Sequence, residues 1–221
     1  MKVFIVIPAY NEENSITKVL SDLQSYNFSN VVVVDDGSED KTALAVRQTT
    51  ACLLIHGINR GMGAALETGN QYALSQGADI IVHFDADGQM QAKDINFLIE
   101  PILKNEADIC LGSRFLSTND EMPWSKKYMI HPISRIINYL FTRVWLTDAH
   151  NGFRALSRQA ASKINISQDR MAHNTEIVEK IRKFNLRYRE IPVTIKYFEY
   201  GQSLAGGFKV LKDLILGKLI R

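Results

Sequence analysis

Five short apolar runs alternate with helical patterns through the first half of this chain, and each run ends in polar or glycine residues. The runs cover residues 3–7, 31–34, 52–55, 80–84 and 107–111. Helical patterns lie between them, over residues 12–25, 41–49, 62–75 and 94–104. Short apolar strands that alternate with helices predict an α/β domain, in which helices cover both faces of a mostly parallel, Rossmann-like sheet.

The size and composition of the chain fit one such domain over residues 1–221. With 221 residues, of which 46% are hydrophobic, the chain is long enough for one buried core and too short for two full domains. A net charge of +2 gives no signature of a nucleic-acid-binding protein. No stretch approaches the roughly 18 uninterrupted apolar residues of a membrane-spanning helix. We therefore expect a soluble or peripheral protein.

Asp85-Ala86-Asp87 places two carboxylates directly after the fourth apolar run and directly before Gly88. An apolar run that stops at paired acids is typical of a buried strand that presents charge at the edge where open α/β sheets bind ligands. Two carboxylates this close repel each other and need a shared proton or a cation. Hard oxygen ligands suit Mg²⁺ or Mn²⁺, which in turn bind phosphate oxygens. An ordinary turn is the alternative, since Asp and Gly are frequent at strand ends.

Polar residues and glycines also follow the first three runs. They are Tyr10 and Glu12 after the first run, Asp35 and Asp36 after the second, and Arg60, Gly61 and Gly63 after the third. A tyrosine can stack on a base, and carboxylates accept hydrogen bonds from a nucleoside. Glycines allow a backbone to approach closely, and a helix N-terminus beside a cation suits a diphosphate. Four polar strand ends on one edge predict a nucleotide site better than they predict four turns.

Two other motifs compete for these residues. Gly61-Met62-Gly63 before a helix resembles a dinucleotide-binding loop, but Leu66 stands where the third glycine belongs and the motif follows the third strand. The Asp-x-Asp-Gly sequence also resembles the nucleophile motif of haloacid-dehalogenase-type phosphatases, with Asp85 as the nucleophile. That motif normally continues with threonine near the N-terminus, whereas here Gln89 follows and three strands precede. The phosphatase stays open as an alternative.

Five motifs, taken in order, carry a resemblance to a known family. They are Ile7-Pro8-Ala9-Tyr10-Asn11-Glu12-Glu13, Val34-Asp35-Asp36-Gly37-Ser38, Asn59-Arg60-Gly61-Met62-Gly63-Ala64-Ala65, Asp85-Ala86-Asp87-Gly88-Gln89 and Gly112-Ser113-Arg114-Phe115. Together they resemble the motifs of family 2 glycosyltransferases with the GT-A fold, and are most similar to those of dolichol-phosphate mannosyltransferase and bacterial polyprenyl-phosphate glycosyltransferases. The resemblance implies an inverting transfer of a sugar from a nucleotide-diphosphate donor, with Mg²⁺ or Mn²⁺ held by the Asp-x-Asp motif.

The resemblance also assigns a donor site by position. The residues that would hold the nucleoside are Pro8, Tyr10, Glu12, Asp35 and Asp36. The residues that would hold the metal or frame the diphosphate are Asp85, Ala86, Asp87 and Gln89. Asp87 is also expected to act in catalysis, because a bound cation stabilises the negative charge that grows on a departing nucleoside diphosphate. UDP- and GDP-linked sugars both fit these strand-end acids.

The second half of the chain is expected to hold the acceptor. We divide the domain into a nucleotide-sugar half over residues 1–114, an acceptor half over 115–200 and a C-terminal surface helix over 207–221. Residues 114–158 carry seven basic side chains against three acids, namely Arg114, Lys126, Lys127, Arg135, Arg143, Arg154 and Arg158 against Asp120, Glu121 and Asp148. Such a bias favours an anionic acceptor or an anionic membrane surface. By resemblance, Arg114, Lys127 and Arg154 would bind the phosphate of polyprenyl (dolichyl or undecaprenyl) phosphate.

Asp148 lies in a segment, residues 147–154, that resembles an Asp-x-x-Ser-Gly-Phe-Arg segment of the same relatives. With Arg114 it is a candidate for catalysis. It would orient a phosphate acceptor, which is already ionised, or act as general base toward a hydroxyl of a glycan or lipid-linked sugar. Glu176 is a second candidate base. Leu204 stands where the relatives often carry lysine, which leaves room for a glycan acceptor. A non-catalytic sugar-nucleotide-binding module that serves a membrane partner protein is a further alternative.

Two amphipathic patterns indicate contact with a membrane surface. One is the apolar stripe of Ile133, Ile137, Leu140 and Val144, and the other is residues 208–220. Packing on the protein core is the alternative for both. We expect a cytoplasmic enzyme of polysaccharide or cell-envelope assembly that is peripheral at the inner face of the membrane, with no nucleic-acid partner.

Overall fold

The computed structural model of the protein describes residues 1–116, 139, 142–148 and 151–196. The predicted C-terminal surface helix over 207–221, Lys127 and most of the predicted apolar stripe lie outside these residues. In the described part of the chain, no helix is both long enough and apolar enough to cross a membrane.

A seven-stranded sheet forms the centre of the described structure, with the strand order β3-β2-β1-β4-β6-β5-β7. Its strands are β1 (Val3–Ala9), β2 (Val31–Asp35), β3 (Cys52–Ile55), β4 (Ile80–His83), β5 (Ile109–Ser113), β6 (Arg154–Ser157) and β7 (Tyr188–Pro192). β6 runs antiparallel to both of its neighbours, and the other strand pairs are parallel. The strand order reverses at β1 and β4, where open α/β sheets form their ligand crevice.

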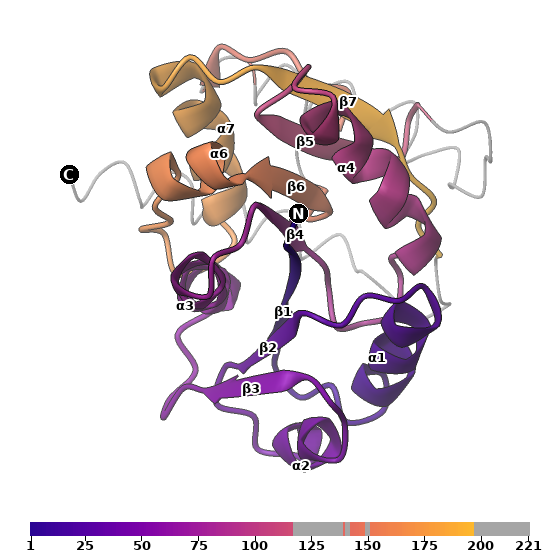
Figure 1. The fold of residues 1–221 in the computed structure, drawn as a ribbon. Coiled ribbons are helices and arrows are strands. Elements are labelled where there is room, and N and C mark those ends of the chain that lie inside the picture. The colour runs from indigo at the N-terminus through magenta and orange to yellow at the C-terminus, as the bar shows by residue number, and fades with distance from the viewer. Residues whose placement is uncertain (117–138, 140–141, 149–150, 197–221) are drawn as a thin grey trace.

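Helices cover both faces of this sheet (Figure 1). They are α1 (Ile16–Ser25), α2 (Thr42–Arg47), α3 (Met62–Ser75), α4 (Ile95–Leu103) after the short 3₁₀ turn η1 (Ala92–Asp94), α6 (Arg158–Lys163) and α7 (His173–Lys183). The first core lies between the sheet and α1, α2 and α4, and the second between the sheet and α3, α6 and α7. Ile5 and Ile7 of β1 enter the first core while Phe4 and Val6 enter the second, because a central strand is buried on both faces.

The α/β class, the five predicted strands and the four predicted helices are confirmed, with shifts of a few residues at their ends. The structure adds β6, β7, α6 and α7. β6 begins with a charged residue, Arg154, although it lies between two other strands. β7 mixes polar and apolar residues and is mostly exposed. Neither strand therefore shows the continuous apolar run of the first half.

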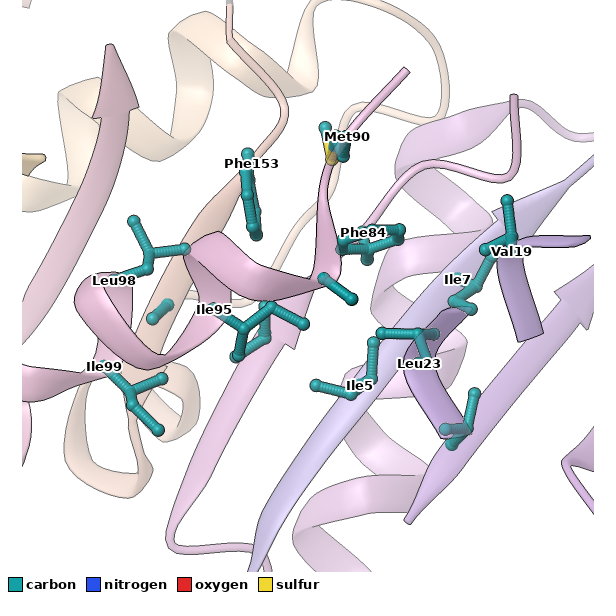
Figure 2. Close-up of a cluster of buried hydrophobic side chains, with 14 of the residues drawn as sticks. Ile5, Ile7, Val19, Leu23, Phe84, Met90, Ile95, Leu98, Ile99 and Phe153 are labelled. Carbon is teal, nitrogen blue, oxygen red and sulfur yellow. The ribbon is translucent and has the colours of Figure 1, made fainter. Parts of the chain in front are cut away.

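The turn that carries Asp85 and Asp87 is anchored in the first core. Figure 2 shows Phe84, directly before Asp85, within this cluster, together with Phe153. The two phenylalanine rings meet edge to face, with centroids 5.4 Å apart. Ala86 is buried in the same core. Because side chains alternate along an extended chain, burial of Phe84 and Ala86 in this core turns Asp85 to the opposite side, where Arg154 and Gly152 lie near its carboxylate.

Candidate functional site

The C-terminal ends of β1, β2, β4 and β5 lie along one edge of the sheet, as the sequence predicts. β6 starts at the same edge, because its first residue, Arg154, pairs with His83 of β4. The loops after β1 and β2 are also joined, since the Glu12 N–H donates to Thr42 Oγ1 at 2.7 Å. The topology thus brings the predicted strand-end residues to one place.

Three carboxylates, those of Glu12, Asp85 and Asp87, lie close enough at this edge to repel one another. Burial, together with the nearby charges of Asp87 and Glu12, raises the pKa of Asp85 to about 7. Burial also raises the pKa of Asp87, and burial with the charge of Asp87 raises that of Glu12. Within the described chain no hydrogen-bond donor reaches the Asp85 carboxylate, and Asp87 accepts one bond, from the Gln89 N–H at 2.9 Å.

The oxygen atoms at this edge suit a divalent cation that binds together with a diphosphate. Carboxylate oxygens are the ligands that Mg²⁺ and Mn²⁺ prefer. The described residues contain no group of three or more His, Cys, Asp or Glu side chains placed to hold a metal ion. A cation held by Asp85 and Asp87 would therefore take further ligands from phosphate oxygens and water, as Mg²⁺ commonly does. The predicted part of the Gln89 side chain in this shell stays a prediction.

Arg154, which the sequence predicts to bind the acceptor, lies in the interior instead. Its side chain is 1% exposed. Its Nη2 atom donates to the Asn151 carbonyl at 3.0 Å and to Asn174 Oδ1. An acceptor at the surface cannot reach this guanidinium, so the predicted contact is not supported. Burial lowers the pKa of Arg154 to about 10, which keeps it charged at neutral pH, and this charge lowers the pKa of Asp85.

Two buried histidines lie beside Arg154. Burial and the Arg154 charge lower the pKa of His83 well below its usual range and that of His173 to about 4. His83 Nε2 lies 2.9 Å from Asn70 Oδ1. Several buried nitrogens of this group, including Nε and Nη1 of Arg154, have no hydrogen-bond partner among the described residues. Each such group costs about 1–3 kcal/mol, so the cluster behind Asp85 is kept at the expense of stability.

Asp36, predicted to bind the nucleoside, is already held by the protein. Its Oδ1 atom lies 2.7 Å from His56 Nδ1 and accepts the Arg60 N–H at 3.1 Å, and its Oδ2 accepts the Gly61 N–H at 2.6 Å. Asp35 Oδ1 accepts the Ser38 N–H at 3.0 Å, as expected of a residue that supports this turn. The structure therefore gives Asp36 a role in shaping the loop after β3, and its contact with a nucleoside stays a prediction.

The glycine loop predicted to bind a diphosphate packs against another part of the protein. The Gly63 N–H donates to the Asp169 carbonyl at 2.8 Å. Gly61 has a φ of 109°, and a Cβ atom there would lie 2.5 Å from the same carbonyl oxygen. Arg60 Nη2 lies 3.5 Å from Asp169 Oδ1. The Gly61 and Gly63 N–H groups thus have acceptors within the protein, and the glycines permit this close backbone contact. Contact of this loop with a diphosphate stays a prediction.

Glu176, the second candidate base, anchors the neighbouring segment. It accepts the N–H groups of Ser167 and Gln168, at 3.0 and 2.8 Å, and pairs with Lys180 at 2.8 Å. Burial alone would raise the pKa of Glu176, but these donors lower it. A carboxylate engaged in this way suits a structural role better than proton transfer.

Arg114 and Asp148 form a two-point ion pair at the end of β5. Asp148 Oδ2 accepts from Arg114 Nε at 2.7 Å, and Oδ1 accepts from Nη2 at 2.7 Å. The Arg114 backbone N–H also donates to Oδ2, at 3.1 Å. The Asp148 side chain is 3% exposed and that of Arg114 is 28% exposed. The carboxylate therefore orients the guanidinium, which is the more accessible partner.

The remaining predicted residues occupy different environments. Tyr10 is exposed beside the edge, where it can meet a ligand. Pro8 is buried in β1, and the Ala86 side chain is buried in the first core, so only the backbone of Ala86 is suited to the predicted donor contact. Glu190, which the sequence did not single out, binds the backbone of the Asp148 loop. In the sequence, Glu190 is recognisable only as an acid inside a short segment that is half apolar.

Comparison with known proteins places these residues in context. The sequence pattern described as Glycosyl transferase family 2 matches residues 4–164. The chain is 31% identical to UDP-N-acetylglucosamine–dolichyl-phosphate N-acetylglucosaminyltransferase of Methanococcus voltae, over 98% of this chain and 96% of the relative. It is 28% identical to undecaprenyl-phosphate mannosyltransferase of Micrococcus luteus, over 94% of this chain and 88% of the relative.

Solved structures with a similar fold include glucosyl-3-phosphoglycerate synthase from Mycobacterium tuberculosis, in complex with Mn²⁺, uridine diphosphate and glucosyl-3-phosphoglycerate. The TM-score is 0.73 at 15% identity, over 97% of this chain and 77% of that chain. At this identity the likeness concerns the fold alone, and the predicted GT-A fold is confirmed.

Proposed function

The chain belongs to glycosyl transferase family 2, and on that premise we propose that it transfers a sugar from a nucleoside diphosphate sugar to a polyprenyl phosphate. Membership of the family makes the protein a glycosyltransferase and sets aside the phosphatase alternative. The relatives from M. voltae and M. luteus are named for dolichyl phosphate and undecaprenyl phosphate, and each aligns with more than nine-tenths of this chain. These names support a polyprenyl phosphate acceptor.

The proposed reaction is a displacement at the anomeric carbon of the donor sugar. An oxygen of the acceptor phosphate forms a bond to this carbon while the bond to the β-phosphate oxygen breaks, so the configuration inverts. The nucleoside diphosphate leaves with the electron pair, and the acceptor oxygen, already ionised, needs no base. When bound, Mg²⁺ or Mn²⁺ would stabilise the charge that develops on the leaving diphosphate. Asp85 and Asp87 would hold this cation, and Tyr10 and Glu12 would contact the nucleoside.

The pair of Arg114 and Asp148 is the observation that carries the choice of acceptor. A general base must present an accessible oxygen to the hydroxyl that it deprotonates. Both Asp148 oxygens instead accept hydrogen bonds from Arg114, and the side chain is 3% exposed. A guanidinium carries five N–H donors in a planar arrangement that suits phosphate, and its charge is opposite to that of a phosphate acceptor. The arrangement therefore favours a phosphate acceptor over a glycan hydroxyl.

An aromatic cluster of Tyr139 and Trp145, which precede Asp148 in the sequence, supports a location at a membrane surface. Tyr139 and Trp145 are 38% and 52% exposed, and the centroids of their rings lie 5.6 Å apart. Arg143 lies over the Tyr139 ring at 6.0 Å. Aromatic and basic side chains are common where proteins meet lipid headgroups. Val144, the one described member of the predicted apolar stripe, packs in the second core instead. We therefore assign peripheral contact at the cytoplasmic face to this aromatic cluster.

The test is a panel of UDP- and GDP-sugars with Mn²⁺ or Mg²⁺, each with and without a short-chain polyprenyl phosphate. The release of nucleoside diphosphate and the formation of glycosylated lipid are both measured. We expect one donor to react only when the metal and the polyprenyl phosphate are both present. Turnover with a glycan and none with polyprenyl phosphate would overturn the proposal. Donor binding with no turnover on either acceptor would indicate a binding module instead.

A further inference from the structure

Glu190, the third residue of β7, binds the loop that carries Asp148. Its Oε1 atom accepts the Thr147 N–H at 2.8 Å, the Thr147 hydroxyl at 2.7 Å and the Asp148 N–H at 3.2 Å. Its Oε2 atom accepts the same Thr147 N–H at 3.0 Å. Four contacts from two adjacent residues to one carboxylate fix the position of this loop relative to β7.

The same loop is also attached to β5, the strand that leads into Arg114. Thr147 Oγ1 lies 2.7 Å from Ser113 Oγ, which in turn accepts the Phe115 N–H at 3.3 Å. β5 and β7 are neighbours in the sheet, with Leu111 opposite Glu190. The chain on both sides of Arg114 is therefore held by one network that starts at the Glu190 carboxylate and ends at the Asp148 carboxylate.

We propose that Glu190 is a positioning residue of the acceptor site, which acts through Asp148 on the direction of the Arg114 guanidinium. It fixes the Asp148 backbone, and the Asp148 side chain fixes Arg114 through Nε and Nη2. Small displacements of a group that orients a substrate have large kinetic effects. This inference rests on the proposed function, because Arg114 is proposed there to bind the acceptor phosphate.

The negative charge of Glu190 is needed for this role. Both of its oxygens face N–H or O–H donors, so a glutamine at this position would turn an NH₂ group toward at least one donor. A neutral side chain would thus keep the length of Glu190 and lose half of its acceptors. A residue that only closes the loop would change stability, whereas a residue that directs Arg114 would change acceptor use in particular.

The experiment compares Glu190→Gln with Glu106→Gln as a matched control. Glu106 is an exposed acid just before β5, and its contact is a surface ion pair with Arg189 at 3.6 Å. We measure kcat and KM for donor and acceptor separately, and the affinity for nucleoside diphosphate with Mn²⁺. In Glu190→Gln we expect the acceptor KM to rise about tenfold while donor KM and nucleotide affinity stay unchanged. In Glu106→Gln no parameter should change.

A second variant, Thr147→Val, keeps both backbone donors and removes the hydroxyl that links Glu190 to Ser113. We expect a rise of about threefold in acceptor KM with donor KM unchanged. Unchanged acceptor KM in both variants, or an equal loss for donor and acceptor, overturns the role of Glu190. If the wild-type protein uses a glycan and not polyprenyl phosphate, the proposed function fails by itself. The acceptor KM and the donor KM of the variants are then compared with that glycan as acceptor. The role of Glu190 and the proposed function are therefore tested separately.

Discussion

The acids on the two sides of the ligand edge are surrounded differently. On the donor side, Asp85 receives no hydrogen bond from the described residues and Asp87 receives one. On the acceptor side, Asp148 accepts three bonds from Arg114, and Glu190 accepts four contacts from the neighbouring loop. Burial raises the pKa of both donor-side acids, and the charges of Asp87 and Glu12 raise that of Asp85 further, which disfavours the charged forms. The donor-side acids are thus arranged to meet a cation, and the acceptor-side acids to hold the protein in place.

One short segment joins the two sides. Asn151 Nδ2 lies 3.5 Å from Asp148 Oδ2, and a Cβ atom on Gly152 would lie 3.2 Å from both oxygens of Asp85. The charges of both acids raise the pKa of Arg154, against the larger lowering by burial. The difference between the two sides therefore arises from the distribution of hydrogen-bond donors around the acids and not from the residue types.

We expect Asp87→Asn, on the donor side, to have the largest effect on turnover. It keeps the shape of the side chain and removes a charge that would hold the cation, so we expect turnover to fall about 10³-fold. The melting temperature should not fall, because Asp87 accepts a single backbone bond. Nucleoside diphosphate release and circular dichroism measure the two effects. Glu100→Gln, which breaks an exposed ion pair with Lys104, is the control. Unchanged turnover in Asp87→Asn would contradict the metal assignment.

On the acceptor side, Arg114→Ala should weaken the use of a phosphate acceptor more than the use of the donor. Loss of charge-assisted hydrogen bonds to phosphate predicts a fall of about 10²-fold in kcat/KM for the acceptor. The donor KM should change by less than about threefold. Steady-state kinetics with each substrate varied in turn test this. An equal loss for donor and acceptor would remove the distinction between the two sides.

Arg154→Met tests whether the buried charge supports the donor side. Methionine has a similar length without the charge, and such replacements of buried ions are often tolerated by the fold. Because the Arg154 charge lowers the pKa of Asp85, its loss should raise that pKa further and weaken Mn²⁺ binding about tenfold at pH 7. Arg158→Met, at an exposed position beyond the opposite end of β6, should leave Mn²⁺ affinity unchanged. Equal Mn²⁺ affinity in wild type and Arg154→Met would show that the buried charge plays no part.

The smallest expected effect is the pH dependence of metal binding. The cation binds ionised Asp85, whose pKa is about 7, so Mn²⁺ affinity should rise about threefold between pH 6.5 and 7.5. The pKa of Asp85 in the folded protein lies above the ordinary aspartate value of 3.8, so this group removes stability from the metal-free protein as pH rises from about 4 to 7. Added Mn²⁺ should therefore raise the melting temperature more at pH 7.5 than at pH 6.5. A flat profile would place the Asp85 pKa outside this range.

The sequence predicts the first half of the fold well because its strands are buried on both faces. The run at residues 31–34, for example, is apolar throughout and forms β2. β6 is not predicted because its first residue is a buried arginine. β7 is not predicted because its exposed residues interrupt the apolar pattern. Helix α7 has its buried residues in a mostly polar sequence, so its pattern is weak.

The residues of the candidate site also fall into those that the sequence could place and those that it could not. Asp85 and Asp87 could be placed from the sequence because a strand end fixes where they lie. The burial of Arg154 and the contacts of Glu190 depend on residues far apart in the chain, such as Thr147, and no local pattern reveals such pairs. The hydrogen bond from the Gly63 N–H to the Asp169 carbonyl is another contact of this kind.

The most direct test of this account is calorimetric titration of Mn²⁺ with nucleoside diphosphate into three proteins: wild type, Asp85→Asn and Asp148→Asn. Each substitution removes one carboxylate charge, one from the donor side and one from the acceptor side. We predict that Asp85→Asn loses metal-dependent nucleotide binding while Asp148→Asn binds as the wild type does. Equal losses in the two variants, or retained binding in Asp85→Asn, would contradict the division between acids that meet a cation and acids that hold the protein.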